Sequence, residues 1–279
     1  MIRRSTSRKW KRERGLRSVV EIGEKGRELV RFLRDEEGVI QPVESYKLDL
    51  DDPRIHNGVI LVGCPDCDQR RDIFEQKEKM LVELGLDPRI HPLLLNGGGL
   101  LIPKKRDGSP SPFNVKLPQD EVLLENIRKA RKIKKIELVG VLVHYPCGAG
   151  EDVQLPEEDV IDMLPAAKAR IQRECPGIKV ACFLHVDKGL SADGKPQKRT
   201  YFVSSRRWLA WAKKRGVEHK WGITEEEVQA MEKEKRPSME FPDVTRPFVR
   251  VPTTPLDVPS EPVVPNNGVS LVNLQVGCP

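Results

Sequence analysis

Apolar residues change their spacing along the chain, and these changes predict alternating strands and helices. Wholly apolar or β-branched runs, typical of buried strands, occur at 59–64, 90–95, 136–144, 178–186 and 200–203. Apolar residues recur at helical spacing over 69–84, 119–132, from about 157, 205–215 and 224–235. Strands that alternate with helices predict an α/β fold, with a mostly parallel central sheet flanked by helices.

Local signals refine this pattern. Pro165 falls inside the helix that begins near 157, and we expect it to kink or split that helix. Thr224 and Glu227 have the spacing of a capping box. We expect a turn containing Asp193-Gly194 to join the last two strands, as in a hairpin or a strand extension. Residues 103–118 contain four prolines and little periodic apolar content, which predicts an exposed insertion without a role in the core.

The two ends of the chain differ from its centre. Residues 1–34 hold twelve Lys/Arg against four Asp/Glu, so the basicity of the chain, +6 overall, belongs to this arm. Apolar spacing in the arm predicts one amphipathic helix before Gly38. The tail has nine prolines among 44 residues, which favours disorder. We therefore divide the chain into a basic arm (1–50), an α/β domain (51–222), a surface helix (223–235) and a Pro-rich tail (236–279).

Composition limits the compartment and the partners. The chain is 38% hydrophobic and 32% charged, and no apolar run approaches the ~20 residues that span a bilayer. No secretory signal opens it, and its six cysteines are scattered, so we expect a soluble cytoplasmic protein without disulfides. Trp208 and Trp211 flank a basic helix, but we expect them to pack in the core and expect no nucleic-acid partner.

Two short motifs follow predicted strands. Cys64-Pro65-Asp66-Cys67 follows the first strand, and His144-Tyr145-Pro146-Cys147-Gly148 follows the third. The carboxyl ends of parallel strands meet at one edge of a sheet, so residues eighty positions apart can reach one point. Thiolate and imidazole ligands suit tetrahedral zinc. We predict that Cys64, His144 and Cys147 bind one Zn²⁺ and leave a fourth position open, and that Cys175 and Cys182 are buried in the core.

These motifs resemble those of the β-class carbonic anhydrases, in consistent order over about residues 58–203. In that family a strand ends in C-x-D-x-R, a Gly-containing loop follows the next strand, and a later strand ends in H-x-x-C-G. The matching segments here are Cys64-x-Asp66, Leu94-Leu95-Asn96-Gly97-Gly98, His144-x-x-Cys147-Gly148, and the turn Asp187-Lys188-Gly189.

The resemblance implies a function and a role for each residue. It implies that Cys64, His144 and Cys147 hold zinc, and that Asp66 accepts a hydrogen bond from the hydroxide that attacks carbon dioxide. Zinc lowers the pKa of its water toward ~7, which makes this nucleophile available near neutral pH. Backbone around Gly148 would help to position the substrate. The family also forms dimers or higher oligomers, which implies a homo-oligomer here.

The chain departs from the family at the arginine of the first motif. That arginine pairs with the motif's aspartate and keeps it off the metal, but position 68 is Asp68 here. Arg70 is our candidate to replace it, with Arg71 as the alternative, one helical turn later. Leu94 or Leu95 stands where the family has a loop arginine.

Three alternatives stay open. Cys67 could complete a closed structural zinc site, which would serve folding or partner binding instead of catalysis; its ligands would be Cys64, Cys67, His144 and Cys147. A hydrolase that acts on an analogue of carbon dioxide, such as carbonyl sulfide, is a third function. His185 beside Asp187 is a weaker candidate, as a proton relay.

Overall fold

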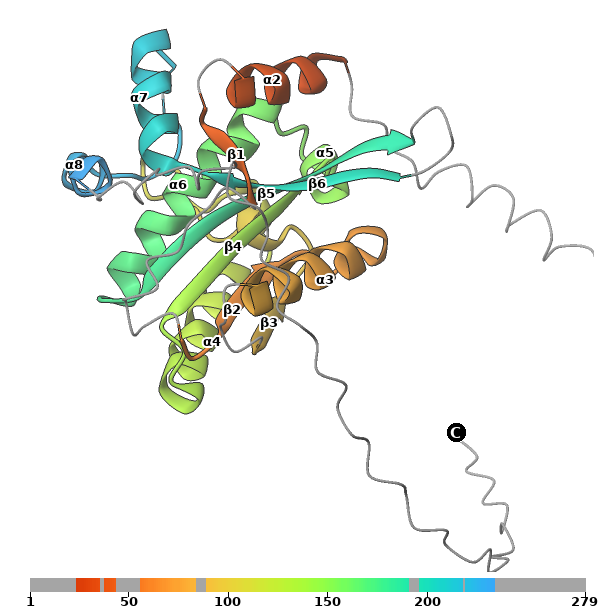
Figure 1. The fold of residues 1–279 in the computed structure, drawn as a ribbon. Helices are drawn as coiled ribbons and strands as arrows, with labels where there is room; N and C mark the ends of the chain where they lie inside the picture. The colour runs from red at the N-terminus through yellow and green to blue at the C-terminus, as the bar shows by residue number, and fades with distance from the viewer. Residues whose placement is uncertain are drawn as a thin grey trace, which may run out of the picture. The chain divides into compact units, whose positions relative to one another are not determined.

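In the computed structural model, a six-stranded sheet forms the centre of the described part of the chain (Figure 1). The strand order is β1-β6-β5-β4-β2-β3. The pairs β2–β3, β2–β4 and β4–β5 are parallel, whereas β5–β6 and β1–β6 are antiparallel. The α/β class is thus confirmed, and the sheet is mixed. The strands are β1 (Ile40–Pro42), β2 (Val59–Gly63), β3 (Ile90–Leu94), β4 (Leu138–Tyr145), β5 (Lys179–Leu190) and β6 (Pro196–Val203).

The structure describes six segments of the chain, all inside a compact unit that spans residues 1–239. These segments are 24–35, 38–43, 56–83, 89–190, 196–217 and 219–233. The first part of the basic arm, the predicted turn at Asp193-Gly194 and the Pro-rich tail lie outside the described residues. Within them, no helix is both long and apolar enough to cross a membrane.

Seven α-helices and two 3₁₀ helices accompany the sheet in the described segments. They are α2 (Glu24–Asp35), α3 (Cys67–Glu83), η3 (Gly98–Leu101), η4 (Pro112–Asn114), α4 (Gln119–Lys134), α5 (Gly148–Asp152), α6 (Glu157–Glu174), α7 (Ser205–Arg215) and α8 (Glu225–Lys233). The predicted helices at 69–84, 119–132, 205–215 and 224–235 correspond to α3, α4, α7 and α8. The predicted capping box of α8 forms, because Thr224 N–H donates to Glu227 Oε2 (2.8 Å) and Glu227 N–H donates to Thr224 Oγ1 (3.2 Å).

Alternation along the strands gives the sheet two apolar faces. Val141 and Val143 of β4 belong to the larger cluster, with side chains from α2, α4, α6 and α7, while Leu142 faces the smaller cluster with Ile73 of α3. The two predicted core tryptophans are buried in the larger cluster, and so are Cys175 and Cys182. The central strands β2 and β4 are buried on both sides, which explains their unbroken apolar runs in the sequence.

Three predictions about local structure need correction. The segment Ile40–Pro42, which we assigned to the arm, pairs with β6 and belongs to the sheet. The insertion at 103–118 contributes to the core, since Ser111 and Asn114 are buried and Asn114 Nδ2 donates to Leu101 O (2.6 Å). Pro165 does not split its helix, because α6 runs as one helix from Glu157 to Glu174. Burial of Val160–Ile171 outweighs the roughly 3 kcal/mol that an interior proline costs.

A buried arginine joins three elements beneath the sheet. Arg170 of α6 is 2% exposed, and its guanidinium donates to Ile102 O at the end of η3 (2.5 Å). It also donates to Asp120 (2.6 Å) and Glu121 (2.7 Å) in the first turn of α4. Asp120 is itself buried, so each charge compensates for the desolvation of the other.

We expect Arg170→Ala to lower the free energy of unfolding by about 3–5 kcal/mol, because Asp120 would remain buried without its counter-charge. The matched control is Arg173→Ala, which removes an ion pair between Arg173 and Glu227 whose arginine is 46% exposed. That loss should be about 0–1 kcal/mol. Urea denaturation measures both, and equal losses would contradict a special role for the buried pair.

A second buried carboxylate connects α6 to the segment after α7. Asp162 Oδ1 accepts hydrogen bonds from Trp208 Nε1 (2.7 Å) and His219 Nδ1 (2.6 Å). The bond and charge of Asp162 raise the pKa of His219, although partial burial acts to lower it. The protonated imidazole therefore helps to hold this segment on α6.

This pair predicts a pH-dependent stability. The folded pKa of His219 exceeds the unfolded value of 6.5, so its contribution is complete below about pH 6.5 and disappears as the pH rises through the folded pKa. Unfolding free energies of the wild type and His219→Gln should therefore differ more at about pH 5.5 than at about pH 8.5. A difference that stays constant with pH would refute the charged pair.

Candidate functional site

The two sequence motifs lie at neighbouring strand ends. Strands β2 and β4 are parallel and adjacent, with Val62 opposite Val141. Continuing this register places Cys64, the residue after β2, level with Val143, next to His144 of β4. Cys147 follows two residues after β4 and is the N-cap of α5. The folding of two parallel βα units therefore brings these three side chains to one edge of the sheet.

Cys64 carries the strongest electrostatic perturbation at this edge. A hydrogen bond from the Cys147 thiol, opposed by burial and assisted by His144 and by the Gly97 N–H, lowers the pKa of Cys64 to about 4. The same sulfur–sulfur hydrogen bond, together with burial, raises the pKa of Cys147. This hydrogen bond therefore favours the thiolate form of Cys64 and the thiol form of Cys147.

His144 presents one ring nitrogen to this pair. Its Nδ1 lies 2.8 Å from Pro146 O, and because a carbonyl only accepts, Nδ1 must carry a proton. In the neutral ring, Nε2 then has the lone pair; this atom is buried and has no hydrogen-bond partner among the described residues. Burial acts to lower the pKa of His144, but the adjacent Cys64 and Asp66 raise it above its ordinary value. The site thus attracts positive charge at Nε2.

Asp66 and Arg70 lie at the start of α3. Asp66 Oδ2 is 3.8 Å from His144 Nε2, and Asp66 O accepts the N–H of Arg70 (2.9 Å). Asp66 directly precedes the first residue of α3, a position where aspartate is common. The Arg70 side chain is exposed. The side chains of Cys67 and Asp68 lie outside the described part of the structure.

The donor atoms at this edge are of the types that a soft or borderline metal prefers, but the present positions of the described residues do not form a metal site. Two sulfurs, an imidazole nitrogen without a hydrogen-bond partner among the described residues and a carboxylate are the donors that zinc prefers, and the bond from Nδ1 to Pro146 O is the usual outer contact of a metal-binding histidine. As the side chains stand, no three His, Cys, Asp or Glu residues within the described segments form a group that could hold a metal ion.

A glycine-containing loop after β3 supports the Cys64 backbone. Gly98 N–H donates to Leu95 O (2.7 Å), and Leu95 N–H donates to Gly63 O (3.2 Å). A Cβ on Gly98 would lie 2.5 Å from the carbonyl carbon of Gly63 and 2.6 Å from Cys64 N. The sequence predicted a loop beside the site, and this close approach explains the need for glycine.

His185 is a neighbour of the site that the sequence motifs did not identify. It pairs with His144 in the β4–β5 register, and burial, assisted by the charge of His144, lowers its pKa to about 4. Its Nδ1 donates to Thr200 Oγ1 (2.8 Å), which donates in turn to Gln76 Oε1 (2.5 Å). The sequence offered no local signal for this pairing, which depends on the register of β4 and β5.

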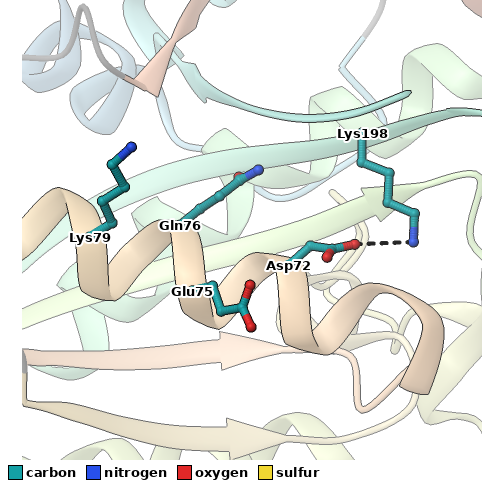
Figure 2. Close-up of a pocket in the computed structure, with 5 residues that line it drawn as sticks. All are labelled: Asp72, Glu75, Gln76, Lys79 and Lys198. Carbon is teal, nitrogen blue, oxygen red and sulfur yellow. Dashed lines mark ion pairs between the residues drawn. The ribbon is translucent and has the colours of Figure 1, made fainter. Parts of the chain in front are cut away.

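Gln76 also lines a shallow groove beyond this chain of hydrogen bonds. The groove encloses about 340 Å³, and Lys198 of β6 forms an ion pair with Asp72 of α3 across it (3.2 Å). Figure 2 shows its lining residues, which are Asp72, Glu75, Gln76, Lys79 and Lys198. The lining has two acidic and two basic side chains, and the groove lies outside the cysteine–histidine cluster.

No family model and no curated protein matches the chain. Among solved structures, the crystal structure of the β-carbonic anhydrase CafA of the fungal pathogen Aspergillus fumigatus is similar, with a TM-score of 0.27 and 12% sequence identity. The match covers 57% of this chain and 83% of that one. A similarity at this level does not define a fold, so the functional interpretation depends on the chain's own residues.

The close approach of Gly98 to Cys64 gives a testable prediction. Both Gly98 (φ 52°) and Gly108 (φ 80°) have positive φ, but a Cβ on Gly108 would meet nothing within 4 Å. Alanine at either position should cost about 1–2 kcal/mol of backbone strain. Gly98→Ala should cost a further 1–3 kcal/mol, roughly, because the strand end must move. Urea denaturation compares the two variants, and equal losses would show that the contact is unimportant.

Proposed function

We propose that this protein is a zinc enzyme that catalyses the reversible hydration of carbon dioxide, with Cys64, His144 and Cys147 as zinc ligands. The observation that supports it most is the buried His144 Nε2, which has no hydrogen-bond partner within normal distance among the described residues and lies close to Cys64 and to Asp66. Burial of an unpaired lone pair is costly, and a cation bound there would remove the cost. The order of the C-x-D and H-x-x-C-G motifs resembles that of β-class carbonic anhydrases, and this resemblance indicates carbon dioxide hydration as the reaction.

The charges of these donors favour a dication. Two thiolates neutralise Zn²⁺, and the ion would replace the proton in the hydrogen bond between Cys64 and Cys147. The Nδ1–H of His144 remains bonded to Pro146 O, which leaves Nε2 as the ring nitrogen that could bind a metal. The three side chains must close around the ion, since no group of three is arranged to hold one as they stand.

The remaining residues have roles around the reacting water. Bound zinc would supply a Lewis acid that lowers the pKa of water toward ~7. Asp66, 3.8 Å from His144 Nε2, is positioned to accept a proton or to orient the attacking oxygen. Arg70, one turn along α3, is the cation that would keep Asp66 from becoming a ligand itself. A Cβ on Gly148 would meet nothing within 4 Å, which leaves space for a small substrate.

The test is stopped-flow hydration of carbon dioxide by full-length protein whose metal content has been measured. We expect one zinc per chain and a hydration rate proportional to zinc content. Asp66→Ala should retain zinc and lose about 10²-fold or more of the rate, because a positioned acid–base group contributes about that much. Cys147→Ala should lose the metal and the activity together, whereas Cys175→Ala, which removes a buried cysteine on α6's C-terminal side, should keep both.

Each outcome separates the proposals. Zinc that is retained in Cys147→Ala would refute this ligand set. Stoichiometric zinc without hydration would refute the enzyme and support the closed site that includes Cys67. Hydration of carbonyl sulfide but not of carbon dioxide would reassign the substrate while keeping the metal centre.

A further inference from the structure

A basic groove lies at the other end of the sheet from the cysteine–histidine cluster. It encloses about 390 Å³ between the end of α4 and the loop before β5, a volume in the range of small-ligand sites. Glu137, which precedes β4, and Pro176, which precedes β5, both line it, so it is at the amino ends of these strands. Cys147 instead follows the carboxyl end of β4, which Figure 1 shows running to α5.

One face of α4 supplies the positive charge of this groove. Six of the eight residues at 128–135 are Lys or Arg. The four that line the groove are Arg128, Arg131, Lys132 and Lys135, at positions i, i+3, i+4 and i+7. This spacing places them in one stripe, about 10 Å long at 1.5 Å per residue. Against four cations the lining has two carboxylates, which leaves a surplus of two positive charges.

The two arginines are already oriented, and the two lysines are available. Arg128 donates to Glu174 (2.6 Å), and Arg131 donates to Pro176 O (2.9 Å), so their guanidinium planes are fixed at the groove walls. Lys132 and Lys135 are exposed, and neither ammonium has an ion pair or hydrogen bond among the described residues. The favourable interaction of cations with a helix C-terminus is confined to the last turn, so it does not explain Arg128.

We propose that this groove binds a linear oligophosphate anion, held by Lys132 and Lys135 and flanked by the two arginines. A stripe of four cations matches a chain of negative groups better than a single small anion, which could reach only one or two of them. Guanidinium forks also suit phosphate oxygens. No aromatic residue lines the groove, so nothing there would stack on a nucleobase. The phosphate chain itself is therefore the recognised group, whether inorganic or part of a nucleotide.

The test is calorimetric titration of the full chain with inorganic tripolyphosphate, without Mg²⁺, at about 50 mM NaCl, where surface charges are weakly screened. We expect saturable binding of one tripolyphosphate per chain. The double variant Lys132→Gln/Lys135→Gln should bind at least tenfold more weakly with unchanged thermal stability. The matched control, Lys213→Gln/Lys214→Gln on α7, removes the same charge from exposed positions away from the groove and should bind within twofold of the wild type.

The comparison ligands distinguish the source of the phosphates. ATP that binds about as well as tripolyphosphate supports recognition of the phosphate chain. Tight binding of ATP without binding of tripolyphosphate would overturn the proposal, and so would equal weakening in the two lysine variants, which would indicate only general charge. Because the groove is remote from the zinc ligands, failure of hydration or of zinc binding would leave this result unaffected.

Discussion

The parallel pairing of β2 with β4 is the constraint on which the candidate site depends. Cys64 and His144 are eighty residues apart in sequence, and only this pairing makes them neighbours. Parallel strands require a long crossover, and α3, β3, η3, η4 and α4 all lie within it. The hydrophobic contacts that bury this crossover therefore also bring a thiolate and an imidazole together. A shift of one residue in the register would turn these side chains to the opposite face.

Two buried contacts help to fix the carboxyl end of β2, which precedes Cys64. Arg170 connects the end of η3 to the start of α4, so it fixes the segment that follows the glycine loop. Gly98, the first residue of η3, lies directly against Gly63 and Cys64. The buried ion pair of Arg170 and the lack of a side chain at Gly98 thus both act on the loop that contains η3. The position of the Cys64 backbone follows from packing well outside the metal ligands themselves.

Sequence patterns predicted the long elements and the two motifs because both signals are local. Five strands and the helices α3, α4, α7 and α8 follow from apolar spacing, and the motifs follow from their places at strand ends. The three-residue β1 is too short to have a period, and its pairing with β6 is set by tertiary contacts. Burial of Asn114 depends on a carbonyl thirteen residues away, and the place of His185 beside His144 depends on register. Neither is visible in a local window of sequence.

The opposite ends of β4 differ in how they can hold charge. At its carboxyl end, the hydrogen bond with Cys64 and burial raise the pKa of Cys147, and the backbone N–H groups of Ala149 and Gly150 at the start of α5 act against that shift. At its amino end, α4 terminates in carbonyl groups, which favour cations and oppose an anion. An anion in the basic groove must therefore be held by side chains alone. The two lysines therefore carry most of the binding there, whereas at the cysteine cluster backbone N–H groups act alongside the hydrogen bond between Cys64 and Cys147.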